Sequence, residues 1–386
     1  MAVPEPDPQA LRRAAHALLA SHWREPGYTC PNAERYPWLW LWDSCFHSIV
    51  WAELGEPDRA ISELRSVFAH RDPETGFVPH MTYFGAPDTG ADFWGRRWTS
   101  SITQPPMFGH AVAELVRRGI DVPPDLVACA TAGLRFLLDL RRRSPGGLIE
   151  LVHPWESGAD DSPRWDHFVG GDWSLERWRQ RKGELLARIK RTESGAPVAN
   201  PDFAVGSASF TALVAFNARE LATVTGDERL TCDADELAGA LDQRWDGDQV
   251  TWVDDGPSAA TSGRARTAEA LLGVLVSRRD GAVSAAFEQL LDPAGFGGRF
   301  GPAGVHRDEP SFDASSYWRG PAWPQISYLL WHATAARGLR GPASTIGQAL
   351  RAGASQSGWA EYWDPDTAVG GGAIPQSWTT LAVLTS

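Results

Sequence analysis

The chain has 386 residues, of which 43% are hydrophobic, so it is long and apolar enough to bury a substantial core. A formal net charge of -12 and a pI near 5.3 argue against nucleic acid or an anionic membrane as a partner, because phosphate binding requires clustered Lys and Arg. The sequence shows neither a secretory signal nor an apolar run of transmembrane length, and a cytoplasmic location is the expectation.

Hydrophobic residues recur at helical spacing along the whole chain, whereas alternating strand patterns are rare. The segments 148–152 and 250–255 are at most short hairpin strands, and the aromatic connection 93–106 is expected to be non-helical. A charged stretch, 172–190, is either helical or part of a mobile lid around 166–200. The pattern predicts helices at 10–22, 43–54, 57–71, 107–118, 123–143, 207–225, 227–245, 267–277, 282–291, 322–337, 344–356 and 377–384.

These helices come in pairs, and every second connection is a long loop rich in aromatic and acidic residues. Such an arrangement predicts an all-α fold, a closed ring of helical hairpins with a pocket formed by the loops at one end. No composition break or Ser/Gly linker divides the chain, so residues 1–386 are expected to form one domain.

Tryptophan is unusually abundant, with 19 residues, and many lie beside acids or Gly-Pro turns. The stretch 153–166, HPWESGADDSPRWD, interleaves several acids with Trp155 and Trp165. One interpretation is structural, with acids capping helices and indoles filling the core. The other is a carbohydrate site, in which rings stack on a sugar and a carboxyl near an indole has its pKa raised enough to donate a proton.

Four further motifs accompany this stretch, in the order WLWDSCFH, SITQPP, YWRGPAWPQ and EYWDPDT. Together the five motifs resemble the clan of inverting α-glycosidases built on an (α/α)6 barrel, glycoside hydrolase families 63 and 37. Within this clan, the chain is most similar to the bacterial family 63 branch of mannosylglycerate and glucosylglycerate hydrolases. The resemblance implies an inverting exo-acting α-glycosidase for a small α-glucoside or α-mannoside, without a cofactor.

In this family the general acid is the Asp that follows ESG by one residue, which implies Asp160, and the base is implied to be Glu361. Inverting hydrolysis needs one protonated and one ionised carboxyl about 6.5–9.5 Å apart, so that a water fits between the sugar and the base. The residues expected to bind substrate come from the same motifs. They are Tyr36, Trp40, Trp42, Asp43, Gln104, Trp155, Glu156, Gly158, Tyr317, Trp318, Arg319, Trp323 and Gln376.

Several of these assignments have structural alternatives. Asp43 is either a helix cap or an acceptor for a sugar hydroxyl, and Glu156 is either a loop support or a sugar ligand. Arg319 is either a pocket residue or the ion-pair partner of a carboxylate. Asp161 and Asp166 are alternative acids that lack the motif match and are better explained as supports.

Metal chemistry is not indicated, because His47, His80 and His153 have no ligand spacing and are expected to lie in or next to the core. The four cysteines have no CxxC spacing, and Cys45 and Cys129 fit buried positions on helices. The motif DPDT is too short to predict a calcium site. Oligomeric state is left open.

The leaving group is also left open at this stage. In the glycerate-hydrolysing branch, a lid after the acid supplies Arg and Tyr to the glycerate carboxylate, whereas here that region offers arginines without a tyrosine. Candidate cations are Arg177, Arg179 and Arg181, or Arg96 and Arg97. Competing functions are a non-catalytic sugar-binding protein on the same barrel and a lyase or isomerase of sugar acids.

Overall fold

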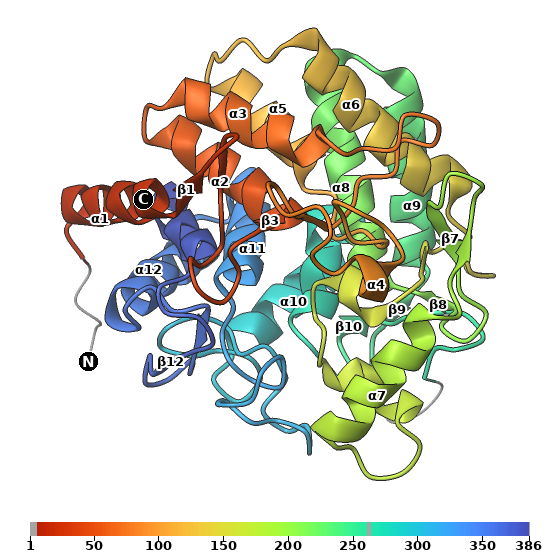
Figure 1. Ribbon diagram of the computed structural model, residues 1–386. Helices are drawn as coiled ribbons and strands as arrows, with labels where there is room; N and C mark the ends of the chain where they lie inside the picture. The colour runs from red at the N-terminus through yellow and green to blue at the C-terminus, as the bar shows by residue number, and fades with distance from the viewer. Residues whose placement is uncertain (1–5, 261–263, 386) are drawn as a thin grey trace.

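The helices of the protein form a ring around a common axis, seen end on in Figure 1. The computed structural model describes residues 6–260 and 264–385. In Figure 1 the colour passes once around the ring, so the first helix lies beside the last part of the chain. None of the described helices combines the length and apolarity needed to cross a bilayer.

Six of the described helices line the inside of the ring, and their side chains are buried on nearly every face. In α2 and α8, for example, the runs 41–51 and 208–218 are buried without interruption. Two of the six, η4 (Glu269–Leu275) and η5 (Ser377–Thr385), are 3₁₀ helices. The inner helices are α2 (Leu41–Glu53), α5 (Phe108–Arg117), α8 (Ala208–Thr225), α11 (Pro324–Ala336), η4 (Glu269–Leu275) and η5 (Ser377–Thr385).

An outer layer of amphipathic helices covers this inner ring, one outer helix against each inner one. Helix α3, for example, buries Ile61, Leu64 and Phe68 and leaves its opposite face in solvent. The outer helices are α1 (Pro8–His22), α3 (Pro57–Phe68), α6 (Pro124–Arg135), α9 (Glu228–Asp242), α10 (Asp280–Leu291) and α12 (Arg340–Gln356).

Contacts between neighbouring helices close the ring. Along the inside, α2 packs on α5, α5 on α8, α8 on η4, η4 on α11, α11 on η5, and η5 back on α2. Each inner helix also contacts at least one outer helix, and η5 is covered by α12 and by α1 from the other end of the chain. The predicted (α/α)6 barrel is therefore confirmed.

Short elements in the connections position the loops at the end of the barrel where the inner helices begin. Each small sheet has two antiparallel strands. The strands are β1 (Trp23–Arg24) with β2 (Tyr28–Thr29), β3 (Leu39–Trp40) with β4 (Met81–Thr82), β5 (Glu150–Leu151) with β8 (Val205–Gly206), β6 (Lys190–Arg191) with β7 (Pro197–Ala199), β9 (Trp245–Asp246) with β10 (Thr251–Trp252), and β11 (Tyr362–Trp363) with β12 (Gly370–Gly371). The remaining helical pieces are α4 (Ala91–Trp94), η1 (Phe136–Leu140), η2 (Pro154–Ser157), η3 (Pro163–Phe168) and α7 (Leu175–Leu186).

Several of the sequence-based expectations need correction. The helix expected at 123–143 ends as an α-helix at Arg135 and continues as one π-helical turn, η1. The segment 267–277 forms a 3₁₀ helix in place of an α-helix, and 93–106 overlaps the short helix α4. Cys45 is fully buried as expected, but Cys129 is partly exposed.

One acid of the outer layer, Glu63 on α3, is entirely buried away from the pocket. Its Oε1 accepts a hydrogen bond from the Thr29 amide at 2.7 Å, and burial raises its pKa to about 8. Because the folded state then binds this proton more tightly than the unfolded state does, its stabilising effect is complete below pH 4.5 and is lost as the pH rises through about 8.

We expect Glu63→Gln to remove much of this pH dependence, which amounts to a few kcal/mol of unfolding free energy as an order of magnitude. Urea unfolding at pH 6 and pH 9 measures it, with Glu288→Gln on the exposed face of α10 as the control. Equal losses of stability between the two pH values in wild type and Glu63→Gln would contradict this account.

Candidate active site

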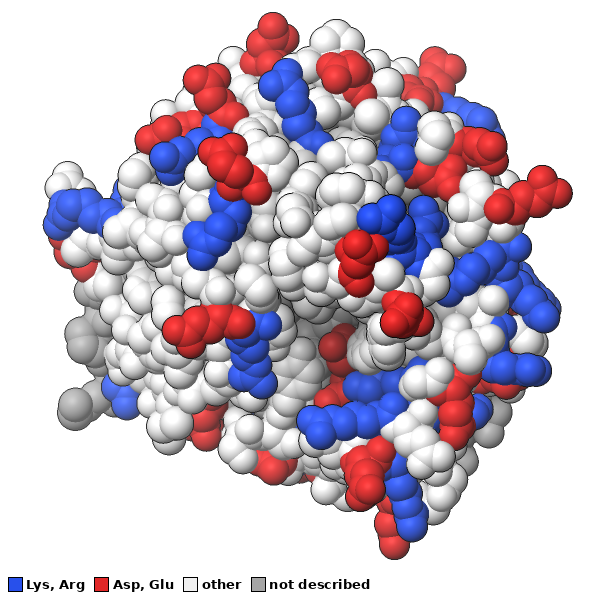
Figure 2. Space-filling model, viewed as in Figure 1, with Lys and Arg blue, Asp and Glu red and all other residues white. Residues whose placement is uncertain are grey.

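The loops that lead into the inner helices enclose a cavity at one end of the barrel, where the surface is hollowed and acidic side chains are exposed in the hollow (Figure 2). The cavity has a volume of about 110 Å³. It combines aromatic rings with amide and carboxyl groups, the combination that sugar binding requires. Its lining residues are Pro31, Tyr36, Trp40, Trp42, Asp43, Gln104, Gly158, Asp160, Tyr317, Glu361, Gln376 and Trp378.

Asp160 lies on the loop after η2 and turns its carboxyl into this cavity. Gly158 makes the turn possible, since its φ is +75° and a Cβ there would lie 2.6 Å from the Trp42 ring. The Trp178 indole donates to the Asp160 carbonyl oxygen at 2.9 Å, but the Asp160 carboxyl has no hydrogen-bond partner among the described residues. It is free to meet a ligand.

The environment of Asp160 suits a proton donor. Burial raises its pKa to about 7, with Asp161 and Glu361 adding to the rise and Lys182 opposing it. Lys182 on α7 reaches Asp161 at 2.6 Å, and its carbonyl oxygen bonds to the His153 ring at 2.9 Å. Helix α7 thus holds the loop of Asp160 in place.

Glu361 directly precedes β11, in the C-terminal part of the chain, and lines the same cavity. Its Oε2 accepts from the Ala373 amide at 2.7 Å, and its Oε1 lies 3.4 Å from the Tyr36 hydroxyl, which donates to it. Burial raises its pKa, and the Ala373 hydrogen bond opposes this rise. A carboxylate fixed in this way can orient and deprotonate a water.

Asp43 is the third acid of the cavity. It lies within the first turn of α2, is 2% exposed and has its pKa raised well above the usual value by burial. The residue that caps α2 is Trp40, so the capping alternative for Asp43 is wrong. The backbone amide of Trp42 donates to Gln104 Oε1 at 3.5 Å, and this bond joins the first turn of α2 to the loop before α5.

Five of the residues expected to bind substrate do not line the cavity: Trp155, Glu156, Trp318, Arg319 and Trp323. Glu156 is fully buried and pairs with both terminal nitrogens of Arg141 at 2.5 and 2.8 Å. It also accepts hydrogen bonds from the Thr103 and Val152 amides. Glu156 therefore supports the loop, which was one of the two alternatives for this residue.

The YWRGPAW motif contributes mainly support. The rings of Trp318 and Trp323 stack on each other at 3.7 Å and are buried, so only Tyr317 of this motif reaches the cavity. Arg319 bonds both oxygens of Asp166 at 2.8 Å, which makes it an ion-pair partner rather than a wall of the pocket. The expectation that Trp318 and Arg319 line the pocket is therefore corrected.

Trp155 belongs to a second cavity that adjoins the first. This cavity has a volume of about 110 Å³ and shares three walls with the first one, Trp40, Gln104 and Asp160. Asp160 thus stands where the two cavities meet. The full lining is Trp40, His80, Met81, Trp94, Gln104, Trp155 and Asp160.

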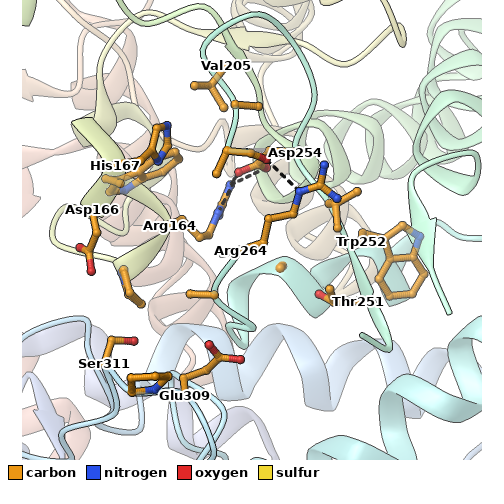
Figure 3. A pocket seen from close by; sticks show the side chains of 18 residues that line it. Arg164, Asp166, His167, Val205, Thr251, Trp252, Asp254, Arg264, Glu309 and Ser311 are labelled. Atoms are coloured by element: carbon orange, nitrogen blue, oxygen red, sulfur yellow. Dashed lines mark hydrogen bonds and ion pairs between the residues drawn. The ribbon is translucent and has the colours of Figure 1, made fainter. Parts of the chain in front are cut away.

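A third cavity, shown in Figure 3, lies behind η3 and has a volume of about 230 Å³. The ion pair of Arg164 and Asp254, 2.7 Å apart, crosses its wall. Neither Asp160 nor Glu361 lines this cavity, so it is separate from the candidate site.

The histidines behave as expected. His47, His80 and His153 are buried, and burial lowers the pKa of each to about 3, so they are neutral. Sequence analysis missed Trp378 and Pro31 as cavity walls, and Lys182 as the partner of Asp161. Trp378 follows Gln376 by two positions, and that proximity was the available signal.

The pKa of Asp160 leads to a prediction about pH. If Asp160 must be protonated to act, kcat/KM should fall as the pH rises through about 7. Lys182→Met should move this alkaline limb to higher pH, because losing the cation raises the pKa of Asp160, while Lys182→Arg should leave the limb in place.

Asp161→Asn should move the limb in the opposite direction, because a neighbouring negative charge is removed. pH profiles of kcat/KM for the four proteins measure these shifts. If the alkaline limb moved in the same direction in all three variants, or did not move in any of them, the charges of Lys182 and Asp161 would not set the pKa of Asp160.

Comparison with known proteins bears on the chemistry of this site. The family model for the mannosylglycerate hydrolase MGH1-like glycoside hydrolase domain matches residues 36–379. A mannosylglycerate hydrolase of Rubrobacter radiotolerans is 28% identical, with 98% of this chain and 97% of that protein aligned. A glucosylglycerate hydrolase of Mycolicibacterium hassiacum is also 28% identical, over 90% of this chain and 91% of that protein.

Comparison with solved structures finds relatives of the same kind. The family 63 mannosylglycerate hydrolase of Thermus thermophilus, in complex with Tris and D-glycerate, matches with a TM-score of 0.84 and 25% identity over 97% of this chain and 99% of that chain. A yeast neutral trehalase, at 14% identity and a TM-score of 0.56 over 98% of this chain and 79% of that chain, shares the fold. The match over most of the chain, together with two carboxyls facing one aromatic cavity, shows that this protein belongs to the MGH1-like glycoside hydrolases.

Proposed function

We propose that this glycoside hydrolase is an inverting, exo-acting α-glycosidase in which Asp160 is the general acid and Glu361 the general base. The observation that carries the proposal is the placement of both carboxyls on one small cavity, with Asp160 at its junction with a second. A single sugar ring in the first cavity and its leaving group in the second would put the bond between them beside Asp160. A cavity of this size favours the removal of one terminal sugar.

The reaction follows from the two environments. Asp160 gives its proton to the oxygen between sugar and leaving group, and the electron pair of the breaking bond remains on that oxygen. Glu361 takes a proton from a water, whose oxygen forms the new bond at the anomeric carbon from the opposite face. Asp160, with its raised pKa, then regains a proton from solvent, and Glu361 releases to solvent the proton that it took from the water.

The remaining cavity residues bind the sugar in this proposal. Asp43 and Gln104 accept and donate hydrogen bonds to sugar hydroxyls, and the indoles of Trp40 and Trp42 and the phenol of Tyr317 provide the walls. The substrate is a small α-glucoside or α-mannoside, and glycerate glycosides are the first candidates because relatives are named for them. We infer as well that the chain is one domain, since one buried cluster runs from Leu11 to Leu384.

The test is release of free monosaccharide from a panel of α-glucosides and α-mannosides, with proton NMR of the first-formed anomer. The proposal expects the β-anomer to appear first and the α-anomer to grow by mutarotation. An α-anomer formed first would exclude inversion. Unsaturated or epimerised products would favour the lyase or isomerase alternative.

A further inference from the structure

The carboxyl of Glu361 is held by a turn of the backbone. Strand β12 pairs with β11 in antiparallel register, with Gly371 opposite Tyr362, and the chain then turns at Gly372 and returns to Glu361. The Ala373 carbonyl oxygen accepts from the Glu361 amide at 2.9 Å, and the Ala373 amide donates to Glu361 Oε2 at 2.7 Å. One residue thus holds both the backbone and the side chain of Glu361. We call Gly372 and Ala373 the anchoring turn.

Gly372 leaves the space that the Glu361 carboxyl fills. Its φ is +73°, a conformation that residues with a Cβ adopt only at a cost. A Cβ at this position would lie 2.2 Å from Glu361 Oε2 and 2.8 Å from Glu361 Cδ, and real Cβ atoms do not approach other heavy atoms this closely. A side chain at position 372 would therefore displace the carboxyl or the turn.

The two oxygens of the Glu361 carboxyl have different surroundings. Oε2 is bound to the Ala373 amide and faces Gly372. Oε1 lies 3.4 Å from the Tyr36 hydroxyl, and Tyr36 and Glu361 both line the first cavity. In the proposed reaction the proton of the water must go to an oxygen that faces the sugar. Oε1 is therefore the oxygen that takes this proton, and Oε2 is the oxygen that fixes the side chain.

A backbone amide suits this task for two reasons. A hydrogen bond to an ionised carboxylate is stronger than one to a neutral group, so the amide favours the ionised form that a general base requires. Burial raises the pKa of Glu361, and the Ala373 amide is the largest of the influences that oppose the rise. The amide also belongs to a hairpin fixed by backbone pairing, so no side-chain rotamer has to be ordered to place it.

The segment that carries the base is tied to the start of η5. The Trp378 indole donates to the Glu361 carbonyl oxygen at 3.1 Å, and the Thr379 hydroxyl donates to the Ala360 carbonyl oxygen at 2.7 Å. Both bonds join this segment to the inner helix that follows the anchoring turn. The support of the base therefore rests on the barrel itself.

We propose that Gly372 and Ala373 are positioning residues for the general base, in which the anchoring turn fixes Oε2 of Glu361 so that Oε1 faces the attacking water. Position 372 must be glycine because the carboxyl occupies the place of a Cβ. The proposal rests on the proposed function and adds to it two residues that do not line the cavity.

The first test is Gly372→Ala, whose methyl group displaces the Glu361 carboxyl from the Ala373 amide. A misplacement of about 1 Å costs about 10²-fold in rate, so we expect a fall in kcat of this size on the preferred α-glycoside and on the corresponding glycosyl fluoride, since both need the base. Affinity for the free monosaccharide should change only a few-fold. The base acts only when ionised, so losing the amide bond should move the acidic limb of kcat/KM to higher pH.

Gly338→Ala is the matched control. Gly338 follows α11 with a φ of +70°, and no atom lies within 4 Å of its Cβ position. The substitution imposes the same kind of backbone strain without touching Glu361. It should lower the thermal unfolding midpoint slightly and keep the kcat and the pH profile of wild type. Equal kcat values in Gly372→Ala and Gly338→Ala would overturn the positioning proposal.

The second test keeps Gly372 and therefore decides the case in which Gly372→Ala fails to fold. In wild-type enzyme labelled with ¹⁵N-alanine, the Ala373 amide resonance should titrate with pH at the midpoint of the acidic limb of kcat/KM. Ala373→Gly identifies this resonance by removing it, and Glu361→Gln should abolish its titration. A resonance that does not titrate, or whose midpoint lies more than about one pH unit from the acidic limb, would show that this amide does not hold the base.

Failure of the proposed function gives a different result. A wild-type enzyme that releases no sugar from any glycoside or glycosyl fluoride would remove the proposed function itself. An active wild type, with Gly372→Ala as fast as Gly338→Ala, would remove only the positioning role of the anchoring turn.

Discussion

Asp160→Asn is expected to lower kcat on an α-glycoside with an unactivated leaving group by about 10³-fold or more. The substitution keeps the size of the side chain and removes the proton that the leaving oxygen needs. The carboxyl has no hydrogen-bond partner to lose among the described residues, so folding should be preserved. Steady-state rates on the preferred glycoside, together with a thermal unfolding midpoint close to that of wild type, measure the effect.

A substrate that needs no acid gives this variant its control. Fluoride leaves without protonation, so Asp160→Asn should hydrolyse the glycosyl fluoride within about tenfold of wild type. Its remaining activity should also lose the fall with pH near 7. Asp121→Asn, at an exposed loop position, is the matched substitution and should have wild-type rates. Equal losses on glycoside and fluoride in Asp160→Asn would assign this residue to binding instead of proton donation.

Glu361→Gln is expected to lower kcat by about 10³-fold or more on glycoside and fluoride alike, because both reactions need an activated water. The glutamine oxygen can still accept from the Ala373 amide, which holds the side chain at 2.7 Å in the wild type. Sugar binding should therefore persist. Rates on both substrates and the affinity for the free monosaccharide by calorimetry measure the two halves of this prediction.

The contrast between the two variants is the sharpest test of the roles. Only the base variant should fail on the fluoride, and Glu288→Gln on the exposed face of α10 should resemble wild type on both. A Glu361→Gln enzyme that retained fluoride hydrolysis would place the base at another carboxyl of the cavity, of which Asp43 is the remaining one.

Local sequence patterns predicted much of this structure. Helical spacing of apolar residues identified the outer helices, because each buries one face, and continuous apolar runs marked the inner helices, which are buried along nearly their whole length. Asp160 and Glu361 were found from short motifs, and both line the same cavity although 201 positions separate their numbers, 361 minus 160. The 3₁₀ form of η4 was missed, and Gly273 within it lies where a Cβ would approach the Trp252 ring to 2.5 Å.

The errors concern the directions of side chains, which sequence spacing does not encode. Glu156 sits two residues after Pro154 in a motif of site residues, yet it turns inward to Arg141. Arg319 turns to Asp166, 153 residues earlier in the chain. Trp318 adopts a φ of +59°, which the neighbouring sequence does not predict, and its ring stacks on that of Trp323. Of these pairs, only Arg319 and Asp166 are brought together by the closure of the ring, whereas the other two depend on how a local loop folds.

Because η5 packs on α2 and α1, the chain forms a closed ring. The loops that carry Asp160 and Glu361 lie in different parts of this ring. Helix α8 begins at the end that holds the cavity and is 18 residues, or about 27 Å, long, so the turn at Gly226 that follows it lies at the far end. A cut there would leave Asp160 on one fragment and Glu361 on the other. Each fragment alone would be inactive, and reassembly of the two fragments would restore turnover. This behaviour is what a complementation reporter requires.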